Sequence, residues 1–158
     1  MDKLLKLIEN DCKMTTEELS MLCEMSDEEI NKKIAEYQEK GIILGYKAVV
    51  DWDKTDTEYV TAMIELKVIP ARDRGFDKVA EKICNYPEVK SVYLMSGGMD
   101  IIVLVEGKTM KEVAYFVARK LAAIDDVTST ATHFVMRKFM DNGIVFGSEK
   151  KDERGNAI

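Results

Sequence analysis

The order of segments between residues 59 and 140 constrains the fold more than any other feature of the sequence. The segments "YVTAMIELKVI", "RGFDKVAEKICNYP" and "EVKSVYLMSGG" indicate strand, helix and strand, and "DIIVLVEG", "TMKEVAYFVARKLAAI" and "VTSTATHFVMRKF" repeat that order. Within the second predicted helix, apolar residues recur at helical spacing, at Val113, Phe116, Val117 and Leu121. Two successive β-α-β units are typical of a ferredoxin-like βαββαβ sandwich, whose sheet carries helices on one face only.

Two of these predicted strands are more apolar than a half-buried strand requires. "SVYLM" and "IIVLV" have apolar side chains at successive positions, so both faces of the sheet would be apolar. We expect one set of side chains to lie under the helices and the other against a second copy of the chain in a two-fold dimer. The two sets are Val103 and Val105 and, on the opposite face, Val92, Leu94, Ile102 and Leu104.

The first 45 residues contain start signals for three short helices. An apolar cluster around Leu4 predicts the first helix. Thr15 or Thr16 can cap the second helix and Ser26 the third, with Glu18 and Glu29 at the spacing of capping boxes. Three helices with a short connection between the second and third predict a helix-turn-helix.

These signals divide the chain into four parts. We expect a winged helix-turn-helix over residues 1–45 and a linking strand or wing over residues 46–58, where β-branched residues are frequent. The ferredoxin-like domain is expected over residues 59–147, and the polar residues 148–158 predict a disordered tail. The fold class is therefore α+β.

The N-terminal part is acidic, which is unusual for a DNA-binding domain. Residues 1–45 carry six lysines and eleven acidic residues, a net charge of −5. Three consecutive acids, Asp27, Glu28 and Glu29, open the third predicted helix. Carboxylates in a first helical turn interact favourably with the helix macrodipole, which is a structural reason for their presence. They do not indicate DNA binding.

Two interpretations of the loop "SGGMD", Ser96 to Asp100, are open. It can be a hairpin turn, in which glycines supply positive φ angles and the aspartate is a polar partner. It can also be a ligand site, because Gly97 and Gly98 let backbone N–H groups approach a carboxylate and Asp100 can accept from an ammonium group. Those are the two charged groups of a free α-amino acid.

The chain resembles the Lrp/AsnC (feast/famine) family of transcriptional regulators over residues 1 to roughly 147. The resemblance rests on "INKKI" and "GIILGY" at the end of the helix-turn-helix, on "YLMSGGMDIIVLV", and on "TATHFV" in the last strand. It implies a DNA-binding N-terminal domain, a linker, and a ligand-sensing and oligomerisation (RAM) domain that dimerises. It further implies assembly of dimers, often to octamers, with amino-acid effectors between them.

By position, the resemblance assigns two sets of binding residues. The DNA-binding candidates are Ser26, Glu28, Glu29, Lys32 and Lys33. The effector-binding candidates are Ser96, Gly97, Gly98, Met99 and Asp100, with Thr130 and Thr132 on the last strand.

The chain departs from the family at both sets. Glu28 and Glu29 stand where small polar residues are usual, Met99 stands where an aromatic is common, and no arginine precedes Arg72. We therefore expect an amino-acid-responsive regulator whose contact with DNA is weak per subunit.

Two other functions compete with that of a DNA-binding regulator. The helix-turn-helix can be degenerate and serve as a protein-interaction surface. Siroheme decarboxylases share the two-domain layout, but their chemistry needs several imidazole and cationic groups, and His133 is the single histidine. The sequence shows no nucleophile elbow, P-loop or metal-ligand spacing, so we expect no enzyme activity, cofactor or metal. With no membrane-length apolar run and no signal peptide, we expect a cytoplasmic protein without a membrane partner.

Overall fold

The computed structural model describes residues 2–72 and 74–147, and the chain divides into two compact units, Met1–Ala48 and Val49–Ile158. This division lies close to the boundary expected at residue 45. The predicted tail, residues 148–158, lies outside the described residues. The roles expected of the four parts stay predictions.

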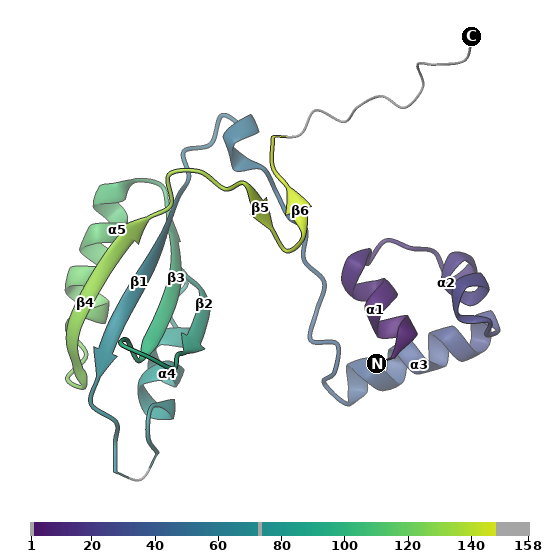
Figure 1. Ribbon diagram of the computed structural model, residues 1–158, viewed down its shortest axis with the longest axis horizontal. Coiled ribbons are helices and arrows are strands. Elements are labelled where there is room, and N and C mark those ends of the chain that lie inside the picture. The colour runs from purple at the N-terminus through teal and green to yellow at the C-terminus, as the bar shows by residue number, and fades with distance from the viewer. Residues whose placement is uncertain (1, 73, 148–158) are drawn as a thin grey trace. The chain divides into compact units, whose positions relative to one another are not determined.

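The first unit contains three helices, α1 (Lys3–Asn10), α2 (Thr16–Cys23) and α3 (Asp27–Glu39) (Figure 1). One side chain from each helix is almost fully buried, and the three form the centre of the unit: Leu4, Leu19 and Ile30. The three helices expected from the sequence are therefore present.

Both expected capping boxes are formed. At the start of α3, the Ser26 hydroxyl accepts from the Glu29 N–H at 3.3 Å, and the Glu29 carboxylate accepts from the Ser26 N–H at 2.9 Å. The start of α2 has the same reciprocal pair. At the other end of α3, Gly41 has a φ of +64°, and the Ile42 N–H donates to the Tyr37 carbonyl at 2.8 Å, which completes a Schellman motif.

The wing or linking strand expected over residues 46–58 is not formed. Every residue of this segment is described, and it contains no strand, only a 3-10 turn, η1 (Trp52–Lys54). The Trp52 ring stacks on Tyr59 with centroids 5.2 Å apart. β-branched residues favour an extended backbone, but a strand also needs a hydrogen-bonded neighbour, which composition does not supply.

Asp2 connects α1 with α3. Its carboxylate accepts from the N–H groups of Leu4 and Leu5 at 2.9 and 3.3 Å, and from the Tyr37 hydroxyl at 2.6 Å. The Tyr37 hydroxyl, followed by the Leu5 N–H, lowers the pKa of Asp2 below its ordinary value. The same hydrogen bond raises the pKa of Tyr37 to about 12.

We expect acid to weaken the first unit through Asp2. Because the pKa of Asp2 is lower in the folded state, its ionised form stabilises the fold above the unfolded-state pKa of about 3.9, and this contribution is lost as the pH falls through the folded-state value. Asp2→Asn retains a capping oxygen but does not titrate, so it should be about 1 kcal/mol less stable than the wild type at neutral pH and lose less stability in acid. Thermal unfolding followed by far-UV circular dichroism at neutral pH and at about pH 2.5 tests this. Equal losses in acid for both proteins would rule out the role of Asp2.

The second unit is built on a four-stranded antiparallel sheet with the strand order β2-β3-β1-β4 (Figure 1). Its elements are β1 (Val60–Val68), α4 (Asp77–Cys84), β2 (Val89–Leu94), β3 (Ile101–Gly107), α5 (Met110–Phe116) with the π-helical turn η2 (Val117–Leu121), and β4 (Val127–Phe134). From β1 to β4, and apart from the π-helical turn, the order of strands and helices is the one predicted.

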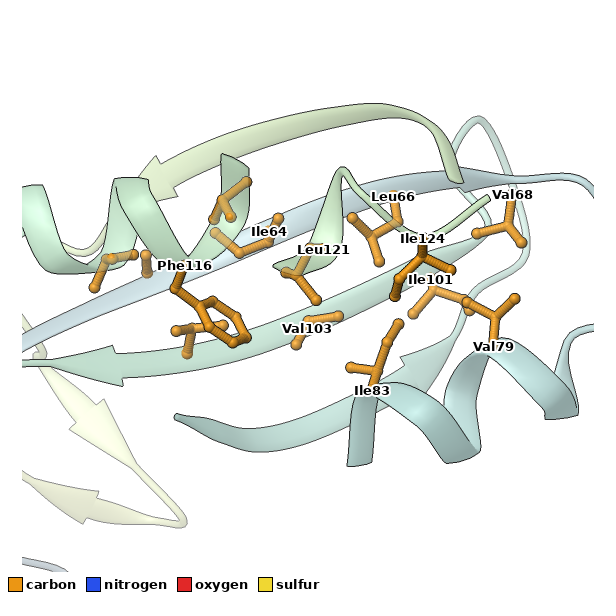
Figure 2. Packing of buried hydrophobic residues seen from close by; sticks show 14 residues of the cluster. Ile64, Leu66, Val68, Val79, Ile83, Ile101, Val103, Phe116, Leu121 and Ile124 are labelled. Atoms are coloured by element: carbon orange, nitrogen blue, oxygen red, sulfur yellow. The ribbon is translucent and has the colours of Figure 1, made fainter. Parts of the chain in front are cut away.

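The main core lies between one face of the sheet and the helices α4 and α5. Figure 2 shows Ile64, Ile101 and Val103 of the sheet pointing toward Ile83 of α4 and Phe116 of α5. Ile64, Ile83 and Val103 are 0% exposed. This apolar packing supplies most of the stabilisation of the unit and makes the sheet a rigid support for its loops.

The strand β3 alternates between two environments. Val103 and Val105 are fully buried under the helices, as expected. Ile102 and Leu104 point to the opposite face, where both are half-buried and Leu104 lies across from Met63 of β1. We call the face opposite α4 and α5 the open face.

The expectation for β2 was wrong. Val92 lies opposite Val103, and Leu94 opposite Ile101, so both point to the side of the sheet that carries the helices and not with Ile102 and Leu104. Val92 packs on the core there, whereas Leu94, which was expected to be buried, is 63% exposed. A register shift occurs early in β2, between Val89 and Ser91. Because side chains alternate with a period of two, a one-residue shift moves a strand's apolar set to the other face.

A short hairpin that was not expected follows the sheet. Its strands are β5 (Met140–Asp141) and β6 (Ile144–Val145). Asn142 and Gly143 have φ angles of +47° and +78°, as a type I′ turn requires. Asn-Gly between apolar residues is a strong hairpin signal, so the sequence contained this information.

Candidate functional site

The helix α3 presents a mixed surface on its exposed side. An α-helix turns about 100° per residue, so the side opposite the buried Ile30 carries Glu28, Lys32, Ala35 and Glu39, all of them exposed. We call these four residues the outward face of α3. It holds two carboxylates and one ammonium group, so it is not a basic surface.

The three acids at the start of α3 have different roles. The Asp27 carboxylate accepts from the Ser20 hydroxyl of α2. The N–H and then the hydroxyl of Ser26 hold the pKa of Glu29 below its ordinary value, as expected for a capping carboxylate. Asp27 and Glu29 therefore stabilise the packing and the start of α3 itself. Glu28 makes no side-chain hydrogen bond or ion pair to any described residue, so its carboxylate is free on the outward face of α3.

The two candidate lysines of α3 lie on different sides of the helix. Lys32 belongs to the outward face and is exposed, whereas Lys33 is half-buried on the flank. Neither ammonium group lies within 4.0 Å of a carboxylate in the described part of the chain. Lys32 is therefore better placed than Lys33 for a phosphate or a base edge.

In the second unit, Asp100 fastens the Ser96–Asp100 loop to β1. Its carboxylate accepts from the Val68 N–H at 2.8 Å, and its own N–H donates to the Leu66 carbonyl at 3.1 Å. Its carbonyl accepts from the Met95 N–H at 2.8 Å. Asp100 thus extends the pairing of β1 with β3, and the hairpin-turn interpretation explains these contacts.

Lys67 is a loop contact that the sequence did not reveal. Its Nζ donates to the Gly98 carbonyl at 2.7 Å and lies 3.7 Å from Oδ1 of Asp100. The alternation of β1 places Lys67 on the open face between the buried Leu66 and Val68. Lys67 reaches this loop because β1 pairs with β3. Periodicity within β1 does not show that pairing, so it could not identify this contact.

The two glycines of the loop differ in backbone conformation. Gly97 has a φ of +128°, which only glycine adopts readily, whereas Gly98 has an ordinary φ. A Cβ built at either position meets no atom within 4 Å. Ser96 is exposed and Met99 is half-buried. The Cβ side of both glycines therefore faces open space, while the Gly98 carbonyl is in contact with Lys67.

We expect alanine to be costly at Gly97 and tolerated at Gly98. Gly97→Ala should lower the free energy of unfolding by about 1–3 kcal/mol because the backbone must move or bear strain. Gly98→Ala should change it by about 0.5 kcal/mol or less. Urea unfolding of the two variants gives both values, and equal stability would show that the loop relaxes to a different turn.

Thr130 and Thr132 are not brought to the loop within one chain. They lie across from Leu66 and Ile64 on β1, and β1 separates β4 from β3. Because the two β1 residues face the helices, the threonines share the helix-covered side of the sheet. Among the expected effector residues, Ser96–Asp100 lie together. Lys67, which was not expected, is a further contact of this loop.

His133 lies on β4, with Nε2 3.6 Å from Oε2 of Glu65. No group of three His, Cys, Asp or Glu side chains suited to a metal ion occurs among residues 2–72 and 74–147. Over the same residues, no helix is long and apolar enough to cross a membrane.

Sequence comparison relates the chain to a family of regulators. The model of the Lrp/AsnC ligand binding domain matches residues 61–145. A Bacillus subtilis protein, named as the uncharacterized HTH-type transcriptional regulator YugG, is 39% identical over 153 residues, or 96% of this chain and 92% of that protein. HTH-type transcriptional regulator FL11 of Pyrococcus furiosus is 27% identical over 135 residues, or 85% of this chain and 86% of that protein.

Solved structures agree on the fold. A transcriptional regulator from Neisseria meningitidis, titled as an L-Met complex, has a TM-score of 0.71 at 21% identity and covers 89% of this chain and 93% of its own. AsnC of E. coli has a TM-score of 0.67 at 21% identity, with 89% of this chain and 95% of that chain covered.

Proposed function

The chain belongs to the Lrp/AsnC family of transcriptional regulators, and on that premise we propose that it binds DNA through α3, as a dimer or larger assembly, and changes this binding when a free amino acid binds. The observation that carries the proposal is the 39% identity that extends over 96% of the chain, and so over both units. Curated relatives are named transcriptional regulators rather than enzymes.

The DNA-binding part of the proposal rests on α2 and α3. Their short connection and their capping boxes fit a helix-turn-helix, whose second helix enters the major groove. Lys32 on the outward face supplies a cation for phosphate, and Lys33 and the Ser26 hydroxyl lie nearby in sequence. Since Glu28 repels phosphate from the same face, the contact of a single subunit is weak.

The effector part rests on the second unit, which we assign to a ferredoxin-like ligand-sensing domain. The Ser96–Asp100 loop offers a carboxylate, exposed backbone and two glycines, the groups that a small zwitterion needs. The Neisseria meningitidis regulator of the same fold is titled as a complex with L-Met, which supports an amino acid as the class of effector.

The assembly part rests on the open face of the sheet. Its centre is apolar, formed by Met63, Ile102 and Leu104, and polar side chains such as Glu65 and His133 lie beside it. We infer that a second copy covers this face in a two-fold dimer, as its apolar centre requires. By the resemblance to the family, such dimers assemble further, to octamers.

A gel shift on the DNA upstream of the gene tests the DNA-binding part, at low salt and with a salt titration. Retarded bands that weaken as salt rises are expected. A thermal-shift screen of the twenty standard amino acids at millimolar concentration tests the effector part, because a bound ligand raises the unfolding temperature. No retardation on any upstream fragment would end the proposal for α3.

One observation favours a second function. Residues 1–45 have a net charge of −5, and the outward face of α3 contains two acids. Such a surface suits a basic protein partner better than phosphate. If the chain binds no DNA, a helix-turn-helix that now binds a protein is the function to test next.

A further inference from the structure

Lys67 occupies the acceptors that the Ser96–Asp100 loop offers to a positively charged group. Its Nζ is 2.7 Å from the Gly98 carbonyl oxygen and 3.7 Å from Oδ1 of Asp100. The other oxygen of Asp100, Oδ2, is taken by the Val68 N–H at 2.8 Å. One carbonyl oxygen and one carboxylate oxygen of this loop, the groups that suit a ligand ammonium, are therefore next to the side chain of a lysine of the same chain.

The chemistry of the two ammonium groups is the same. The α-ammonium of a free amino acid would seek a carboxylate and a carbonyl oxygen, and Lys67 already contacts one of each. Lys67 sits on a flexible four-carbon stem, and its side chain is 47% exposed, so it can leave without disturbing the sheet. Asp100 is less exposed and stays fixed by Val68.

We propose that Lys67 is an internal competitor of the effector, because its ammonium group fills the subsite that the effector's ammonium group must enter. The proposal rests on the effector part of the proposed function. Molecules in which Lys67 has left the subsite are the ones that can bind the effector. The apparent affinity is therefore the intrinsic affinity multiplied by the fraction of such molecules. Since the pair is partly exposed, this reduction is modest, about threefold to tenfold.

An alternative role of Lys67 predicts the opposite change in effector affinity when Lys67 is replaced. Lys67 could instead bind the carboxylate of the effector, and its removal would then weaken binding. We call the proposed blocking of the subsite by Lys67 occlusion. Occlusion predicts that removal of Lys67 strengthens binding of the effector. The direction of the change therefore separates the two roles without knowledge of the effector's side chain.

Isothermal titration calorimetry of Lys67→Met, Lys67→Arg and the wild type with each of the twenty standard amino acids tests this. Lys67→Met should bind the best amino acid about threefold to tenfold more tightly, while Lys67→Arg, which keeps the charge, should resemble the wild type. The analogue of that amino acid without the amino group should not distinguish Lys67→Met from the wild type. Lys90→Met is the matched control, because Lys90 is paired with Glu106 at 3.6 Å on the same sheet and is not a contact of the loop.

Each outcome decides the proposal. Tighter binding by Lys67→Met, or binding seen in Lys67→Met alone, supports occlusion. Weaker or unchanged binding overturns it and leaves the effector function standing. If no variant binds any amino acid, occlusion and the effector part of the proposed function both fail, and the gel shift still tests DNA binding separately. Lys67→Gln replaces Lys67→Met if circular dichroism shows that Lys67→Met does not fold.

Discussion

Replacing Lys32 and Lys33 by alanine should abolish detectable binding to the upstream DNA. No arginine precedes Arg72, and α3 (Asp27–Glu39) has no basic residue in its last turn, so these two lysines supply all of its positive charge. Each lost phosphate contact removes a counterion-release contribution, and a dimer loses the contacts of both subunits together. We expect the affinity to fall about 100-fold or more at low salt, with the larger share from Lys32.

The control for this double variant removes the same charge from another helix. Lys3→Ala with Lys6→Ala takes two exposed lysines from α1, and binding should fall by less than about threefold through the change in net charge alone. Fluorescence anisotropy with a labelled upstream fragment measures both variants. Equal affinity of the Lys32 and Lys33 double variant and the wild type would show that α3 does not contact DNA.

Placing a charge at the centre of the open face should separate the proposed dimer. Leu104→Asp introduces a carboxylate among Met63 and Ile102, and two-fold symmetry brings two such carboxylates into the same interface. An unpaired charge that is buried on association costs several kcal/mol, so the dimer should dissociate at micromolar concentration. Leu104 lies away from the helix-covered core, so the subunit should still form its sheet, although at lower stability.

Sedimentation velocity at micromolar concentration measures the effect of Leu104→Asp. The wild type should sediment as a dimer or a larger species, and Met110→Asp, which adds the same charge at an exposed position of α5, should sediment like the wild type. A wild type that is a folded monomer at this concentration would refute the dimer. A Leu104→Asp protein that keeps the wild-type size would place the interface on another surface.

Local signals predicted the helices and strands well. The helix starts at Thr15 and Ser26 depend on hydrogen bonds between residues three apart, which the sequence displays directly, and Gly41 ends α3 as expected. The turn at Asn142 and Gly143 is equally local, and the Asn-Gly pair is its signal in the sequence.

Long-range pairing was the part that the sequence could not supply. The face on which Val92 lies depends on a register shift in β2, and periodicity within one strand does not show where such a shift occurs. The same limit hid the contact of Lys67 with the loop, because it requires the pairing of β1 with β3. Asp100 illustrates the reverse case: its residue type indicated a polar role, but only the structure showed that Val68 takes one of its oxygens.

The proposed function requires that an amino acid alter the DNA affinity of this chain. The most direct measurement is the anisotropy of a labelled upstream fragment, titrated with the wild-type protein at low salt, with and without the amino acid that gives the largest thermal shift. Coupling between two binding sites typically changes affinity about 5-fold to 150-fold, and we expect a change in that range. The same affinity with and without every amino acid, or no binding to any upstream fragment, would contradict the claim.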